Sequence, residues 1–340
     1  MNRIRKHIYL LFALTMLFAP VFLVESKDQY VLKFATIAPE GTTWMKTMEE
    51  MNQEIQKLSS GRLKIRFYPG SIMGDEIDVL RKMRINQIHG GGFSGVGMGE
   101  IVPDVRALDL PFIFKNTKEV ESTLAKLHDR FANDFRAKGF EFMGWAEVGF
   151  VNVFSKSPVK SIEDLRKTKM WVWQDDPVAS SIFQGLGIPT IPLAMPDVMT
   201  SLQVGIIDTF YSPPLGAIAL QWYTKVKYMM SFPITHSTGS VLVSKNFYDK
   251  LPPDLQEILK SQFAKYLSIL NQRTRKDSQD AIETLKKNQI EIVTSSEAEM
   301  KQFEDASVKV RNDLAGKIYS KEILNELISV IKSVNEKEPE

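Results

Sequence analysis

Apolar and polar positions follow the two-residue period of strands and the longer period of helices in short, alternating blocks. Basic and apolar side chains alternate over residues 62–67, which predicts a half-buried strand, and residues 31–37 predict another. A helix capped by Thr42 or Thr43 is predicted between these strands, and a second helix over residues 75–86. Strands and helices in such close succession favour an α/β domain with a largely parallel sheet.

Two apolar runs, residues 149–154 and 240–243, predict strands that carry the chain from this domain to a second one and back. Two crossings between globular halves create a hinge, and clefts between domains are favoured ligand sites. The expected division is a first domain of residues 27–150 plus 240–275 and a second domain of residues 151–239 plus 276–335.

Residues 252–288 carry one long helical pattern. At about 1.5 Å per residue, such a helix is about 50 Å long, so we expect it to brace both domains. Residues 296–335 are also expected to be helical. The apolar stripe of the long helix consists of Leu255, Ile258, Leu259, Phe263, Leu267 and Leu270.

The first 26 residues have the pattern of a cleavable export signal. A basic start is followed by an apolar run over residues 8–24, which is short for a membrane span, and small residues precede a cleavage point after Ser26. An uncleaved anchor is the alternative. We therefore expect residues 1–26 to be a signal peptide and the mature chain to be soluble outside the cytoplasm.

Cysteine is absent from the sequence. For an exported protein this excludes disulfides, thiolate catalysis and thiolate metal ligands. The formal net charge is only +2, which gives no indication of a nucleic-acid partner. The histidines include no close pair that could hold zinc, so we expect neither a metal nor a cofactor. They are His7, His89, His128 and His236.

The glycine-rich segment over residues 90–95 formally matches G-x-G-x-x-G. The dinucleotide fingerprint requires a buried strand before the glycines and a helix that begins within them, and residues 86–89 do not predict that strand. We expect a flexible strand-to-loop turn here, where the backbone approaches a ligand closely.

Sequence patterns of common hydrolases are missing. There is neither an H-E-x-x-H nor a G-x-S-x-G motif. The adjacent Asp175 and Asp176 are expected to form a solvated turn before Pro177. The sequence therefore gives no support for an enzyme, although a hydrolase or isomerase that uses cleft carboxylates stays an alternative.

Trp171 and Trp173 stand two residues apart in the segment KMWVWQDD. If the segment is a strand, both indoles project from one face and can form a floor on which a ligand stacks. Two core tryptophans are the alternative.

Six segments, in order, resemble the extracytoplasmic solute-binding proteins of TRAP (tripartite ATP-independent periplasmic) transporters. They are APEGTTW, GRLKIRFYPGSIMGDE, DLPFIF, KSIEDLRKTKMWV, GLGIPTIPLAMPDVMTSLQVGIID and KNFYDKLPPDLQEIL. The resemblance covers nearly the whole mature chain. It implies a periplasmic receptor with the periplasmic-binding-protein fold, in which two α/β domains with central sheets are joined by a hinge and braced by a long helix near the C-terminus.

The resemblance also implies function. Such a receptor closes on a small solute and delivers it to the small and large membrane subunits of a permease, and a periplasmic helper protein is a further candidate partner. Many members bind organic acids, and an Arg in a K-I-R pattern then clamps the ligand carboxylate.

The sequence departs from that pattern at the residues that hold an acid. Trp171 stands where the clamping Arg is expected, Ser212 where acid binders commonly have Asn, and Met195 where they have Phe. Asn152 falls where sialic-acid receptors of the family carry another Arg. An indole offers one neutral donor where a carboxylate needs a charged pair, and each lost charge-assisted bond is worth about 1.5 to 3 kcal/mol. We therefore expect an apolar or flat, ring-bearing ligand.

The predicted ligand contacts are Trp171, Trp173, Tyr211, Ser212, Phe210, Met195, Asn152, Phe93, Trp44 and Glu147. A second interpretation is a quaternary ammonium ligand that is held by cation–π attraction, with Glu147 or Asp175 as counter-charge. A carrier of lipids and a receptor that feeds a signalling protein also remain alternatives.

Overall fold

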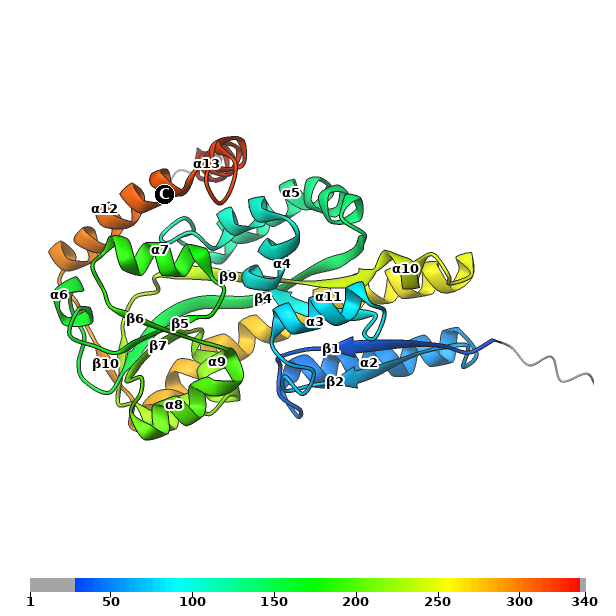
Figure 1. Ribbon diagram of the computed structural model, residues 1–340, viewed down its shortest axis with the longest axis horizontal. Coiled ribbons are helices and arrows are strands. Elements are labelled where there is room, and N and C mark those ends of the chain that lie inside the picture. Colours follow the sequence, from blue (N-terminus) through cyan, green and yellow to red (C-terminus); the bar gives the residue numbers. More distant parts are fainter. Residues whose placement is uncertain (1–27, 337–340) are drawn as a thin grey trace, which may run out of the picture.

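The computed structural model describes residues 28–336. The predicted signal peptide lies outside the described residues. The described part forms one mixed sheet with helices on both faces (Figure 1). The strands are β1 (Tyr30–Ala35), β2 (Leu63–Tyr68), β3 (Gly90–Ser94), β4 (Phe140–Ser155), β5 (Met170–Trp173), β6 (Thr190–Leu193), β7 (Thr209–Ser212), β8 (Tyr228–Met230), β9 (Thr235–Ser244) and β10 (Glu291–Val293).

Two long antiparallel strands, β4 and β9, hold the sheet together at its centre. The strand order is β2-β1-β3-β9-β4-β7-β5-β6, with β8 on the far end of β4 and β10 beside β8. β9 pairs with β3 through its C-terminal half, and β4 pairs with β7 and β8 through its last residues. We call the elements on the β3 side the first lobe and those on the β7 side the second lobe. Each lobe is therefore attached to one end of the β4–β9 strand pair.

The helices of the first lobe begin at well-formed caps. Thr42 caps α2, and Asp75 forms a capping box with α3. The buried face of α2 carries methionines that pack on β1 and on the long helix of the chain. The elements are α2 (Thr43–Leu58), α3 (Glu76–Arg84), α4 (Gly95–Ile101), the 3-10 helix η2 (Pro103–Asp109) and α5 (Thr117–Ala137).

Apart from α12, the helices of the second lobe are short. Asp176 caps α7, whose first residue is a proline, a combination that favours a sharp helix start. The elements are α6 (Ile162–Leu165), α7 (Pro177–Gly185), η3 (Met195–Asp197), α8 (Val198–Val204), α9 (Pro214–Ala219), η4 (Trp222–Lys225) and α12 (Glu297–Leu314).

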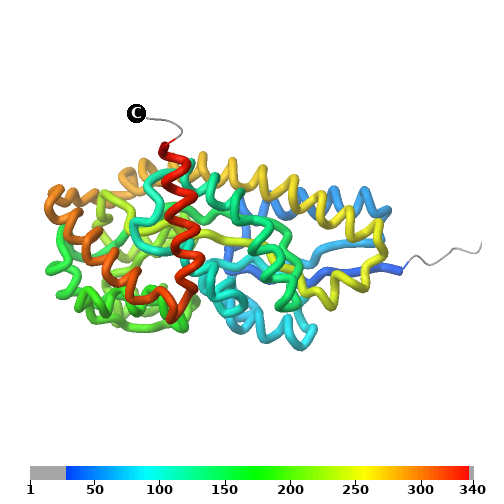
Figure 2. Tube along the Cα trace, turned by 90° about the horizontal axis from the view of Figure 1, so that it is seen from above, coloured from blue at the N-terminus to red at the C-terminus, as the bar shows by residue number. Residues whose placement is uncertain are grey.

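The long helix α11 (Pro253–Lys287) follows the short helix α10 (Lys245–Tyr248) and confirms the predicted brace. It runs along most of the length of the molecule (Figure 2), packing on α2 in the first lobe, on β4 at the centre and on α9 in the second. The predicted stripe is buried except at Ile258, which is partly covered. One helix therefore spans both lobes on the same face.

The last helix, α13 (Lys321–Glu336), packs on α5 and η2 of the first lobe, whereas α12 packs on α6 and α7 of the second. The chain therefore crosses between the lobes once more after α12. None of the helices within residues 28–336 is long and apolar enough to cross a membrane.

The glycine-rich segment is not the flexible turn that was predicted. Residues 90–94 form strand β3 in the middle of the sheet, and α4 begins directly at Gly95. The glycines are needed because side chains lie against their backbone. A Cβ on Gly95 would lie 1.5 Å from Asp109 Oδ2, and one on Gly92 would lie 2.9 Å from the Trp44 ring.

A truncation in the stripe of α11 tests how far this helix holds the fold together. Leu259 is fully buried against the core of the first lobe, whereas Ile282, further along the same helix, is 36% exposed. We expect Leu259→Ala to lower the free energy of unfolding by about 2 to 5 kcal/mol. The matched Ile282→Ala should cost under about 1 kcal/mol in urea-induced unfolding. Equal losses would contradict a brace that acts through its buried stripe.

Candidate functional site

A cavity of about 490 Å³ lies between the two lobes. Its walls come from the segment after β1, from the ends of β3, β5 and β7, from the middle of β4 and β9, and from α9. In an open α/β sheet, the ends of the strands where neighbouring chain segments diverge are the usual ligand site. The cavity occupies such a position, and both lobes contribute to it.

Eight of the ten predicted contact residues line this cavity. The first lobe and the central strands contribute Trp44, Phe93 and Glu147, and the second lobe contributes Trp171, Trp173, Met195, Tyr211 and Ser212. The sequence pattern and the family resemblance thus selected residues that the fold does bring together.

Phe210 and Asn152 do not line the cavity. Phe210 is fully buried, stacks on Phe154 with ring centroids 5.0 Å apart, and meets the edge of Trp222. It follows the alternation of β7, in which Tyr211 points to the opposite face. Asn152 is buried and donates a hydrogen bond to the Met230 carbonyl at 3.0 Å. Both side chains hold the second lobe together.

The two indoles of β5 lie side by side, as predicted, with ring centroids 6.3 Å apart. Trp171, however, is only 1% exposed, because Tyr211 stacks on its ring at 5.0 Å and Trp222 meets it edge-on. Its indole N–H donates to the Leu193 carbonyl at 3.0 Å. Trp173 is also buried, at 7% exposed, and Tyr211 is half-buried. The predicted floor of two open indoles is therefore not formed, and Tyr211 presents more of its ring than either tryptophan.

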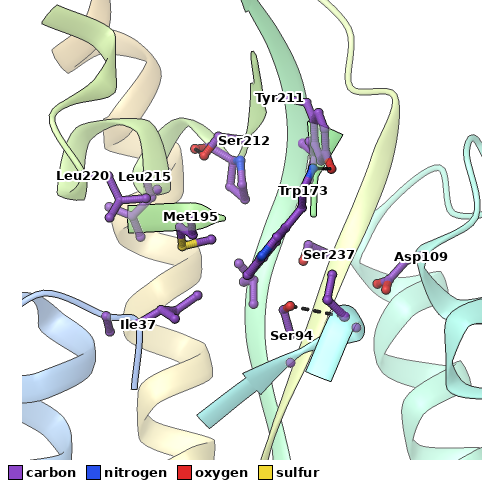
Figure 3. Close-up of a pocket in the computed structure, with 18 of the residues that line it drawn as sticks. Ile37, Ser94, Asp109, Trp173, Met195, Tyr211, Ser212, Leu215, Leu220 and Ser237 are labelled. Carbon is purple, nitrogen blue, oxygen red and sulfur yellow. Dashed lines mark hydrogen bonds between the residues drawn. The ribbon is translucent and has the colours of Figure 1, made fainter. Parts of the chain in front are cut away.

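Apolar side chains form one side of the cavity. Figure 3 shows Leu215 and Leu220 of the α9 region together with Met195 and Ile37 on one side, and Ser94, Ser237 and Asp109 on the other. Each of the four apolar side chains is partly exposed to the cavity space. The aliphatic residues of α9 were missed by sequence reasoning, since a short apolar run such as PPLGAIAL cannot be told from core.

Asp75 is a second residue that sequence reasoning missed. It lies just outside the cavity and joins two of its wall residues. Its Oδ2 accepts hydrogen bonds from the indole N–H of Trp173 at 2.8 Å and from the backbone N–H of Met195 at 3.1 Å. These contacts run from the first lobe to the second. Only the GDE sequence before α3, a common helix start, marks Asp75 in the sequence.

One arginine lines the cavity among residues 28–336, and two carboxylates engage it. Arg106 is 5% exposed; its Nη1 donates to Asp109 at 2.8 Å and its Nη2 to Asp176 at 2.6 Å. Although burial opposes the charge, Asp176 and Asp109 keep the pKa of Arg106 raised. The predicted solvated turn is wrong for Asp176, which is buried as the cap of α7, whereas Asp175 is exposed.

Two further carboxylates lie on the wall. Glu76 is buried and accepts hydrogen bonds from the N–H groups of Ser94 and Gly97, both at 2.8 Å, and from the Ser94 hydroxyl at 3.0 Å. Burial raises the pKa of Glu76 to about 7 and that of Asp109 to about 6. Burial also opposes ionisation of Glu147, but His236 and Arg275 hold its pKa below the ordinary value, and Arg275 Nε donates to it at 2.6 Å.

The charge balance of the wall is therefore acidic. Four carboxylic acids and one arginine line the wall, and two of the acids, Asp109 and Asp176, are paired with that arginine. Glu147 is paired with Arg275, which lies outside the wall, and the raised pKa of Glu76 keeps that acid partly protonated near neutral pH. A ligand carboxylate would therefore lie among acids without an unpaired cation beside it. In the part of the chain that the structure describes, no group of three or more His, Cys, Asp or Glu side chains could hold a metal ion.

Comparison with known proteins places the chain among solute-binding proteins. Residues 34–317 match the family model described as bacterial extracellular solute-binding protein, family 7. A solute-binding protein of Verminephrobacter eiseniae is 30% identical over 233 residues, which cover 67% of this chain and 68% of that protein. The 2,3-diketo-L-gulonate-binding periplasmic protein of Escherichia coli is 26% identical over 76% of this chain and 78% of its own length.

Solved structures have the same fold. The sugar acid binding protein of Advenella mimigardefordensis in complex with galactonate has a TM-score of 0.86 at 21% identity, covering 90% of this chain and 99% of that chain. A TRAP periplasmic solute binding protein of Haemophilus influenzae with bound L-gulonate has a TM-score of 0.83 at 18% identity, covering 89% and 99%.

The raised pKa of Glu76 makes the stability of the protein depend on pH in a defined direction. The folded protein holds the proton on Glu76 more tightly than the unfolded chain does, so this contribution is complete below pH 4.5 and is lost as the pH rises through about 7. Relative to Glu76→Gln, the wild type should lose on the order of 3 kcal/mol over that range.

Urea unfolding of both proteins between pH 4.5 and 7.5, without added ligand, measures this difference. Glu49→Gln, at an exposed position on α2, is the control and should follow the wild type at every pH. If the difference between Glu76→Gln and the wild type stays constant with pH, the assigned ionisation of Glu76 is wrong.

Proposed function

Since the chain belongs to family 7 of the bacterial extracellular solute-binding proteins, the receptors of TRAP transporters, we propose that its cavity captures a small uncharged ligand with an apolar or ring-shaped body. The predicted family and fold are confirmed. Proteins of this family bind small molecules in the periplasm, work with membrane permease components and are not enzymes. The class of ligand is what we propose beyond membership of this family.

Relatives argue for a different ligand class. The E. coli relative is named for a keto sugar acid, and the structural neighbours hold galactonate, glucuronate or gulonate. Those solved structures share at most about a fifth of their residues with this chain, which makes the side chains of its own cavity the better guide.

The main support for this proposal is that Arg106 donates hydrogen bonds to Asp109 and Asp176. A guanidinium that clamps an acid must offer its paired N–H groups to the ligand. Here Nη1 and Nη2 each donate to a protein carboxylate instead. A ligand carboxylate that displaced one of these buried partners would leave that partner unpaired, which typically costs 3 to 5 kcal/mol. Only the Nε–H of Arg106 has no hydrogen-bond partner among the described residues, and a single N–H cannot form the paired clamp.

The apolar side of the cavity supports the same conclusion. Leu215, Leu220, Met195 and Ile37 present aliphatic surface, and Tyr211 with Trp173 presents ring faces. Each apolar group of a ligand that is buried there gains about 25 cal/mol per Å². The thioether of Met195 adapts to irregular shapes.

A quaternary ammonium ligand is a second candidate, because the wall carries more carboxylic acids than cations. The counter-charges named from the sequence are not free for this role. Glu147 is paired with Arg275, and Asp175 is exposed and outside the cavity wall. Asp109 and Asp176 are occupied by Arg106, so the neutral ligand is favoured.

The remaining roles follow from the family and the sequence. We propose that residues 1–26 direct export to the periplasm, that the protein delivers its ligand to the small and large permease subunits, with a helper protein as a further partner, and that it performs no covalent chemistry. The predicted domain boundaries are kept as the proposed moving units, except that α13, which was predicted to belong to the second domain, packs on the first lobe and is proposed to move with it. A lipid carrier, a sensor-feeding receptor and a carboxylate enzyme are the competing functions.

Native mass spectrometry of protein purified from the periplasm, without refolding, tests the ligand class. We expect a bound molecule that is uncharged and leaves the protein chemically unchanged when extracted. Isothermal titration of ligand-free protein with galactonate and glucuronate should show no binding at micromolar concentration. Micromolar affinity for either acid would refute the proposal, and turnover of the extracted molecule would establish an enzyme instead.

The apolar wall is tested by Leu215→Asn, which places an amide without a partner against the ligand. We expect the affinity for the extracted molecule to fall by about ten- to a hundredfold, in line with about 1 to 3 kcal/mol for an unpaired amide. Leu58→Asn is the matched control, because Leu58 is exposed on α2 and outside the cavity wall. Unchanged affinity in Leu215→Asn would show that the ligand lies elsewhere.

A further inference from the structure

The two lobes are joined beside the cavity by direct hydrogen bonds between protein groups. Asp75, at the start of α3 in the first lobe, accepts from the Trp173 indole at 2.8 Å and from the Met195 N–H at 3.1 Å. Trp173 ends β5 and Met195 begins η3, so both donors belong to the second lobe. Both are also cavity-wall residues.

A buried ion pair makes a second bridge between the lobes. Arg106 of η2 in the first lobe donates to Asp176, the cap of α7 in the second lobe, at 2.6 Å. Both side chains are less than 10% exposed. Separation of the lobes would break this pair and the Asp75 contacts together.

Each of these charged groups has a second partner within its own lobe. The other oxygen of Asp75 accepts from the Glu76 N–H at 2.8 Å, Asp176 accepts from the N–H groups of Val178 and Ala179 at 3.0 Å, and Arg106 keeps Asp109 at 2.8 Å. A carboxylate at a helix N-terminus is stabilised by the helix even when its other partner leaves. When the lobes separate, each charged group therefore keeps a partner. A buried ion pair is normally hard to break because one charge is left without any partner.

We propose that Asp75 and Trp173, assisted by Arg106 and Asp176, form a reversible latch that closes the lobes before a ligand arrives. Asp75 is then a positioning residue, since it fixes Trp173 and Met195 of the cavity wall from outside the cavity. A receptor whose binding-competent form is already populated loses less affinity to the closing step, because the apparent dissociation constant is divided by that populated fraction. This inference goes beyond the proposed function and does not depend on which ligand is bound.

The strand β5 supplies a matched pair of variants. Trp173→Phe removes an N–H that crosses between the lobes. Trp171→Phe removes an N–H that bonds the Leu193 carbonyl within the second lobe. Both substitutions keep an aromatic ring and change a buried tryptophan of the same strand. Asp75→Ser is a third variant, because serine still caps α3 but is too short to reach the second lobe.

The open and closed forms can be measured by single-molecule fluorescence energy transfer on the ligand-free full chain. The sequence has no cysteine, so dyes attach only at Lys57→Cys on α2 and Glu163→Cys on α6, both exposed and in different lobes. We expect the wild type to populate a closed form without ligand. Trp173→Phe and Asp75→Ser should each lower the closed-to-open ratio by roughly tenfold, the effect of about one hydrogen bond.

Trp171→Phe should leave that ratio within about twofold of the wild type, even if its melting temperature falls. A wild type that is entirely open without ligand would overturn the latch, and so would an equal response of Trp171→Phe and Trp173→Phe. Asp75→Ser decides the question if either tryptophan variant fails to fold. Because no ligand is added, these outcomes are independent of the titrations that test the ligand class.

Discussion

The positive charge of Arg106, buried between the lobes, constrains most of what the site can do. A guanidinium in a low-dielectric interior must be balanced by charge and hydrogen bonds. The chain meets this requirement with Asp109 from the same lobe and Asp176 from the other. The same arrangement makes this part of the cavity wall polar and joins the lobes, and we propose that it influences both ligand choice and closure.

The proposed closure depends on the geometry of two helix starts. Asp75 and Asp176 are both N-caps, and both also contact the opposite lobe. Their roles as caps fix them in place within one lobe, which lets them meet partners on the other with little reorganisation. The aliphatic side of the cavity, by contrast, belongs mainly to α9 and η3, which α11 and the core of the second lobe support. The two sides of the site thus rest mainly on different elements and are connected where Asp75 accepts a hydrogen bond from the Met195 N–H.

Much of the fold could be predicted from local patterns. The strand alternation of residues 62–67, the caps of the first helices and the stripe of α11 correspond to real elements, because each depends on near neighbours in the sequence. The glycine-rich strand β3 was misread, since its composition reflects the close approach of Trp44 and Asp109, which come from distant parts of the chain. Phe210 was assigned to the site because the sequence does not show which of the adjacent residues Phe210 and Tyr211 faces the cavity. Asp75, Arg106 and α9 were missed for the same reason: their roles depend on which segments the two crossing strands bring face to face.

A crystal structure of the protein with the ligand that it carries from the periplasm is the most direct test. It should show Arg106 still bonded to Asp109 and Asp176, and an uncharged molecule lying against Leu215, Met195 and Tyr211. A ligand carboxylate bonded to the Arg106 guanidinium, with either aspartate displaced, would contradict the central claim.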